Sequence, residues 1–96
     1  MPNDMAKNLL LCMRDLHPKE CNLIVGALNT FGPSKYRDNP LPYNDPIRLG
    51  FRLDPKDIKD VLAALHEVYS FQGTAAALQT ARKLKRMCQQ SKSSKP

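Results

Sequence analysis

Apolar residues recur at steps of three and four along four stretches of the chain, and this spacing places them on one face of an α-helix. It predicts helices over residues 3–16, 18–31, 55–70 and 75–89. Pro18 and Pro55 stand at first helical positions, where the missing N–H has no partner to lose. Gly32 follows the second stretch, at the place where glycine commonly adopts a left-handed backbone and ends a helix. We therefore expect an all-α fold, a small four-helix domain.

A long connection, residues 32–54, joins the second and third predicted helices. Its prolines exclude one continuous helix, and they are Pro33, Pro40, Pro42 and Pro46. At about twenty residues, the connection is longer than most. Its last part alternates apolar residues with polar residues or glycine, and this period of two predicts a short extended segment over 47–53. That segment would lie extended over the helices, or pair with a strand of a second copy or of another protein.

The length and the cysteine content set further limits. A chain of 96 residues fits a single helical domain, residues 1–90, followed by a disordered basic tail over 91–96. No apolar run approaches the ~18 residues that a membrane span needs. The chain has three cysteines and no Cys-x-x-Cys pair, which argues against a disulfide framework. We therefore expect a reducing compartment, the cytoplasm or the nucleus.

The charge of the chain is unevenly distributed. The formal net charge is +6, yet residues 1–72 are balanced, so all of the excess lies in residues 73–96. The fourth predicted helix places its basic residues opposite an alanine-rich face. A cationic surface of this kind is typical of proteins that bind phosphate backbones. We therefore expect a nucleic-acid-binding site, for RNA or without sequence preference, made of Arg82, Lys83, Lys85, Arg86, Lys92 and Lys95. An anionic membrane surface is disfavoured, because the helix lacks a bulky apolar anchor.

A second hypothesis concerns the proline-rich connection. It combines aromatic and arginine side chains, which are enriched at the centres of protein interfaces. The candidate contact residues for a protein partner, or for self-association, are Tyr36, Arg37, Tyr43, Arg48, Phe51 and Arg52. Small basic viral proteins often combine binding to nucleic acid with binding to protein, and the size of this chain fits that pattern by analogy.

Catalytic and metal-binding patterns are weak in this sequence. His17, His66 and the cysteines lack the spacing of metal ligands. The cysteines fall on predicted apolar faces, where a free thiol behaves as a small buried hydrophobe. The four glycines are isolated, so they form no phosphate-binding loop. The carboxylates near residue 55 have the positions of first-turn helix charges. We expect no enzymatic activity, no cofactor and no metal.

Overall fold

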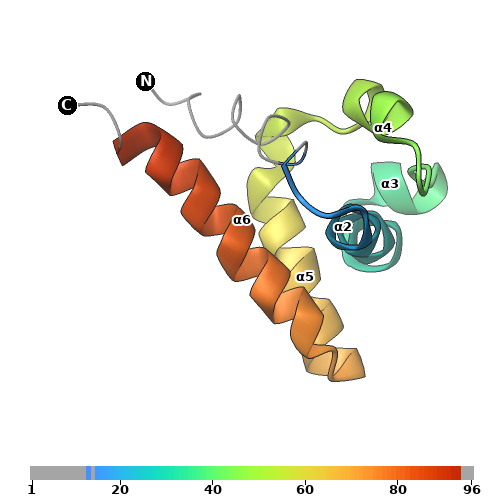
Figure 1. Ribbon diagram of the computed structural model, residues 1–96. Coiled ribbons are helices and arrows are strands. Elements are labelled where there is room, and N and C mark those ends of the chain that lie inside the picture. Colours follow the sequence, from blue (N-terminus) through green and yellow to red (C-terminus); the bar gives the residue numbers. More distant parts are fainter. Residues whose placement is uncertain (1–12, 14, 94–96) are drawn as a thin grey trace.

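The computed structural model describes Met13 and residues 15–93. Every element in this part of the chain is helical, which confirms the all-α fold class (Figure 1). The elements are α2 (Pro18–Phe31), α3 (Ser34–Asp38), α4 (Pro46–Arg52), the 3₁₀ turn η1 (Pro55–Asp57), α5 (Ile58–Gln72) and α6 (Ala75–Ser93). The helix predicted over 3–16 lies outside the described residues except for its last few positions, and so does the end of the predicted tail. Because α6 extends to Ser93, it includes the first residues of that tail.

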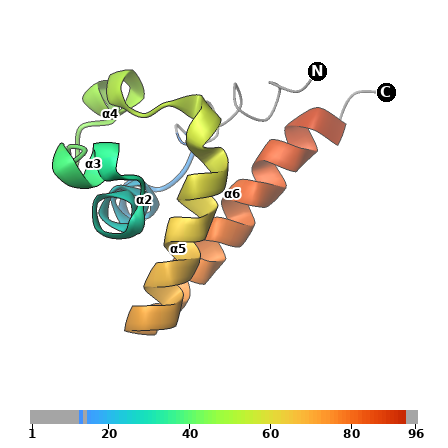
Figure 2. The same ribbon diagram turned by 180° about the vertical axis from the view of Figure 1, so that it is seen from behind.

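Helix α5 packs against both α2 and α6, and α2 and α6 also touch each other (Figures 1 and 2). Small residues on α6 allow it to approach α5 closely, and they include Ala77 and Ala81, which are both buried. Larger apolar side chains fill the rest of the core, and the fully buried ones are Ile24, Val25, Leu28, Val61, Leu65 and Leu84. Burying each of these side chains contributes about 1.5–3 kcal/mol before chain entropy is subtracted. The three helices therefore form the scaffold that positions the rest of the chain.

Local signals explain how α2 and α5 begin and end. At the start of α2, His17 Nδ1 accepts a hydrogen bond from the Lys19 N–H, and a Glu20 carboxylate oxygen accepts one from the His17 N–H. This reciprocal arrangement is a capping box. Helix α5 ends at Gly73, whose φ of 67° is left-handed. Gly32 does not have the expected left-handed backbone. It is extended, and a Cβ there would lie 2.6 Å from the Leu28 carbonyl oxygen, so close packing requires the glycine.

The connection contains two short helices, and the expected extended segment over 47–53 is wrong. The described residues contain no strand, and most of this segment belongs to α4. A helix-start signal outweighs the alternating pattern: Pro46 takes the first position, and a carboxylate oxygen of Asp45 accepts the Arg48 N–H at 3.1 Å. In a helix, residues two apart point in nearly opposite directions. Leu49 therefore turns toward the core, while Phe51 turns toward solvent.

Asparagine side chains hold the connection against α2. The Asn29 side chain accepts the Leu41 N–H at 2.8 Å and donates to the Leu41 carbonyl at 3.1 Å, replacing the pairing that a strand would supply. The Asn22 side chain accepts the Asn44 N–H at 3.0 Å and donates to the side-chain oxygen of Asn44 at 2.6 Å. The side chain of Leu41 is buried. The N–H and carbonyl of Leu41 and the N–H of Asn44 are thereby satisfied, and these bonds hold the irregular segment against α2.

Candidate nucleic-acid interface

The outer face of α6 carries three exposed cationic side chains, those of Arg82, Lys85 and Arg86. Both arginines stand two residues from the fully buried Leu84, which puts each about 160° around the helix from the core. They are one turn apart, so their Cα atoms are separated by about 6 Å along the axis. Among the residues with described side chains, no Asp or Glu forms an ion pair with any of the three cations. We refer to these three residues as the α6 face.

Lys83 differs from its neighbours because it pairs with an acidic residue of α2. Its Nζ lies 3.2 Å and 3.4 Å from the two carboxylate oxygens of Glu20. Burial raises the pKa of Glu20, but the His17 N–H and the Lys83 ammonium outweigh it and hold the pKa below its ordinary value. Glu20 therefore stays ionised and holds Lys83 at the edge of the face. Lys83 was predicted as a contact to nucleic acid, and that role stays a prediction for a side chain that is paired within the fold.

The last two predicted contacts cannot be placed. Helix α6 includes position 92, but the side chain of Lys92 lies outside the described residues, as does the whole of Lys95. Both stay predictions from the sequence.

Tyr36 was predicted to contact a partner, and the structure corrects this because the residue is only 3% exposed. Its hydroxyl donates to a carboxylate oxygen of Asp57 at 2.5 Å and accepts the Asp54 N–H at 3.0 Å. Lys35 completes the cluster with its Nζ 2.8 Å from the same Asp57 oxygen. Burial, together with the bond to Asp57, raises the pKa of Tyr36. The side chain fastens α3 to the start of α5 and is not available to a partner.

Arg52 is also used within the fold. Its guanidinium donates to the carbonyls of Pro40 at 2.6 Å and of Asn39 at 2.5 Å, directly after α3. Carbonyl oxygens do not neutralise a guanidinium, so the charge of Arg52 remains while its position is fixed. The arrangement ties the end of α4 to the residues that follow α3.

The remaining candidates in the connection are exposed to different degrees. Arg37 and Arg48 are on the surface, with Arg48 Nε 4.0 Å from a carboxylate oxygen of Asp45. Tyr43 is half exposed and rests against α2. Phe51 is almost fully exposed, and Ile47, which was not among the predicted contacts, is three-quarters exposed. If Asp45-Pro46 had been interpreted as a helix start, the sequence would have placed Ile47 on the same helical face as Phe51.

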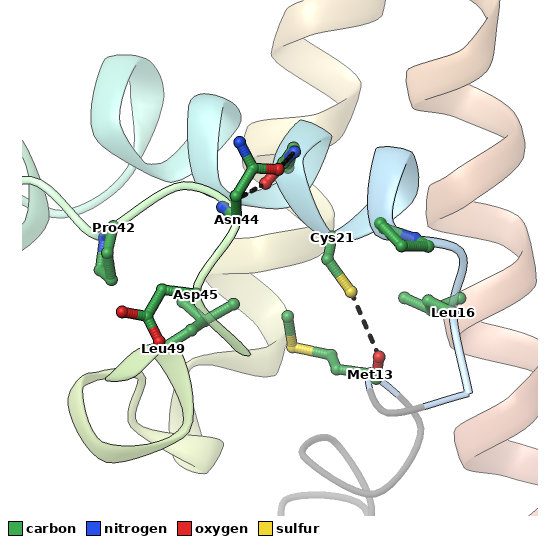
Figure 3. Close-up of a pocket in the computed structure, with 9 residues that line it drawn as sticks. Met13, Leu16, Cys21, Pro42, Asn44, Asp45 and Leu49 are labelled. Atoms are coloured by element: carbon green, nitrogen blue, oxygen red, sulfur yellow. Dashed lines mark hydrogen bonds between the residues drawn. The ribbon is translucent and has the colours of Figure 1, made fainter. Parts of the chain in front are cut away.

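A pocket of about 300 Å³ lies between the start of α2, residues 42–45 and Leu49 of α4 (Figure 3). Its one nucleophile, Cys21, donates its S–H to the Met13 carbonyl at 3.2 Å. Burial raises the pKa of the Cys21 thiol, and the nearby Glu20 raises it further. A protonated thiol is a poor nucleophile. The amides of Asn22 and Asn44 bond to each other, so the pocket wall offers few free polar groups that could orient a ligand.

Within the described residues, no cluster of three His, Cys, Asp or Glu side chains is arranged to hold a metal ion. None of the helices in that part of the chain combines the length and the hydrophobicity that crossing a bilayer requires. Comparison with known proteins finds no protein-family model, no curated protein and no solved structure that matches this chain.

Proposed function

We propose that this protein binds nucleic acid through the α6 face, either as an RNA-binding protein or without sequence preference, and that it is not an enzyme. The observation that carries the proposal is three exposed cations on one helical face of a chain whose excess charge lies entirely in its last quarter. A merely solvated helix surface would be expected to mix both signs of charge. Nucleic acid and reduced thiols occur together in the cytoplasm and the nucleus, which are the compartments that this proposal implies.

The chemistry of the face favours phosphate contacts. Arg82 and Arg86 can each present two parallel N–H donors to a phosphate, and Lys85 adds a point charge beside them. Among the described side chains of α6 there is no aromatic ring on which a base could stack. Contacts of this type position a strand without reporting its sequence, so the expected binding is weak, electrostatic and sensitive to salt.

The number of cations sets the size of the salt effect. Each phosphate contact to a single strand contributes about −0.7 to the slope of log affinity against log salt, so three contacts give about −2. Between 50 and 200 mM salt, the affinity should then fall about twentyfold. If Lys83 leaves Glu20 and makes a fourth contact, the fall grows to about fiftyfold.

Fluorescence anisotropy with a labelled 20-nucleotide single-stranded RNA of mixed sequence tests the proposal. In the double variant Arg82→Gln and Arg86→Gln, the charge changes by two while glutamine preserves helix propensity. We expect its affinity to fall at least tenfold and the magnitude of its salt slope to fall by about 1.4. The control variant, Arg37→Gln and Lys56→Gln, removes the same charge from α3 and η1, and its affinity should change by no more than about twofold.

Two outcomes would contradict the proposal. An affinity that does not respond to salt would exclude phosphate contacts as its source. Equal losses in the α6 variant and the control would show that net charge, and not this face, attracts the nucleic acid.

A further inference from the structure

Helix α4 exposes two large apolar side chains, which lie on its outer surface in the part of the chain that the structure describes. Leu49 of the helix and Leu53, which caps its C-terminal end, are 5% and 2% exposed, whereas Ile47 and Phe51 are 75% and 87% exposed. Ile47 and Phe51 are one helical turn apart, so they stand side by side on the outer surface. We call this pair the α4 ridge. Single exposed apolar residues are common, but an adjacent pair at these exposures on one short helix indicates an interaction surface.

The two flanks of the α4 ridge differ chemically. Arg48 and Arg52 lie together on one flank, also one turn apart. The carbonyls that hold Arg52 fix its charge in place, so a partner's carboxylate would meet a positioned cation. On the other flank is Gly50, and a Cβ built there would meet no atom within 4 Å. The bare backbone at Gly50 leaves room for another element to approach closely.

The charge of the surface argues against a second copy of this chain as the occupant. Two large side chains offer roughly 300 Å² of apolar surface, less than the about 800 Å² that a stable interface buries on each partner, so any occupant needs favourable charge contacts beside the apolar ones. A twofold contact would also bring Arg48 and Arg52 close to the same residues of the other copy. Both copies would carry a formal charge of +6, so the contact would be repulsive.

We propose that the α4 ridge docks an acidic amphipathic helix of another protein. Ile47 and Phe51 would enter the apolar stripe of that helix, and carboxylates beside the stripe would pair with Arg48 and Arg52. This is recognition through apolar anchors at i and i+4, with guanidinium–carboxylate pairs fixing the orientation. The site is separate from the proposed nucleic-acid site, since α4 and α6 lie on opposite sides of α5 (Figures 1 and 2).

Selection from a displayed library of helical 18-residue peptides, randomised at all surface positions, tests the proposal with the full-length chain as bait. We expect enriched peptides to share an apolar stripe flanked by at least two Asp or Glu residues. Isothermal titration of the best synthetic peptide should show binding that weakens more than tenfold in Phe51→Ser. Phe71→Ser removes a largely exposed ring of α5 that stacks on Phe31; it is the matched control and should bind as tightly as the unmodified chain. The double variant Arg82→Gln and Arg86→Gln should also bind the peptide normally while losing RNA affinity, which separates this proposal from the one for α6.

Each alternative occupant has its own signature. If no acidic peptide is enriched, or if enriched peptides bind Phe51→Ser unchanged, the ridge is not a helix-docking site. Light scattering that shows a dimer lost in Phe51→Ser would assign the ridge to a second copy. Co-sedimentation with vesicles of three parts phosphatidylcholine and one part phosphatidylserine, lost in the same variant while no peptide binds, would assign it to a membrane surface. Any of these results overturns the proposal.

Discussion

Replacing Phe51 with alanine should leave the free energy of unfolding almost unchanged, whereas replacing Leu49 should lower it by several kcal/mol. Truncating a fully buried Phe costs about 3–5 kcal/mol. Phe51 is 87% exposed, so only about an eighth of that cost, roughly 0.5 kcal/mol, applies. Alanine also has the higher helix propensity, which offsets about 0.5 kcal/mol. Leu49, which is buried, should cost about 2–5 kcal/mol when it becomes alanine.

Urea unfolding at 25 °C, followed by circular dichroism at 222 nm, measures the two changes as shifts of the midpoint at constant slope. Leu53→Ala should behave like Leu49→Ala, and Ile47→Ala should behave like Phe51→Ala. An extended segment would instead place all four apolar residues on one face, where their truncations would cost similar amounts. The helical description of α4 is therefore refuted if Phe51→Ala costs more than about 1.5 kcal/mol, or more than half the cost of Leu49→Ala.

Two further predictions concern hydrogen bonds within the fold. Tyr36→Phe should cost about 2 kcal/mol at pH 7 in urea unfolding, because it removes a buried bond to a charged acceptor. Partial burial raises the pKa of Asp57, but its bonds to Lys35 and Tyr36 outweigh this effect and hold the folded pKa below the ordinary value. The contribution of ionised Asp57 to the free energy of unfolding is thus full above the ordinary pKa, and it is lost as the pH falls through the folded pKa. The difference in free energy of unfolding between Tyr36→Phe and the unmodified chain should accordingly become smaller below about pH 4. A difference that stays constant with pH would contradict this account. Glu20→Gln should cost less than about 1 kcal/mol, since glutamine also completes a capping box and the lost ion pair with Lys83 is partly exposed. Releasing Lys83 should raise RNA affinity in anisotropy by about two- to fivefold, and a decrease would count against the α6 proposal.

The helix starts were accessible to sequence reasoning because each is a local signal. A capping side chain followed directly by proline begins α2 and η1, and the same pair, Asp45-Pro46, begins α4. The start of α4 was missed because the apolar residues after Pro46 alternate with other residues, and this alternation predicted an extended segment. Alternation predicts a strand only when one face is buried. In α4 the alternating residues divide between two faces, because Phe51 and Ile47 remain in solvent.

The site was harder to predict because its decisive contacts join distant parts of the chain. The ion pair of Lys83 with Glu20 spans 63 positions, and the bond from Tyr36 to Asp57 spans 21. Composition shows that residues 73–96 are cationic, but the packing of α2 beside α6 decides which cation is paired. In the same way, nothing near Tyr36 in the sequence indicates that a proline-rich connection folds back and buries it.

The two proposed surfaces can act at the same time because α5 separates them. Packed helices lie about 8–10 Å apart, and α4 does not pack against α6, so partners on the outer surfaces of α4 and α6 would be roughly 20 Å apart or more. The Debye length at physiological salt is about 8 Å. An acidic helix on α4 and a phosphate backbone on the α6 face would therefore repel each other weakly in the cell and more strongly at low salt. Because of this screening, one small cationic chain can bind two anionic partners at the same time.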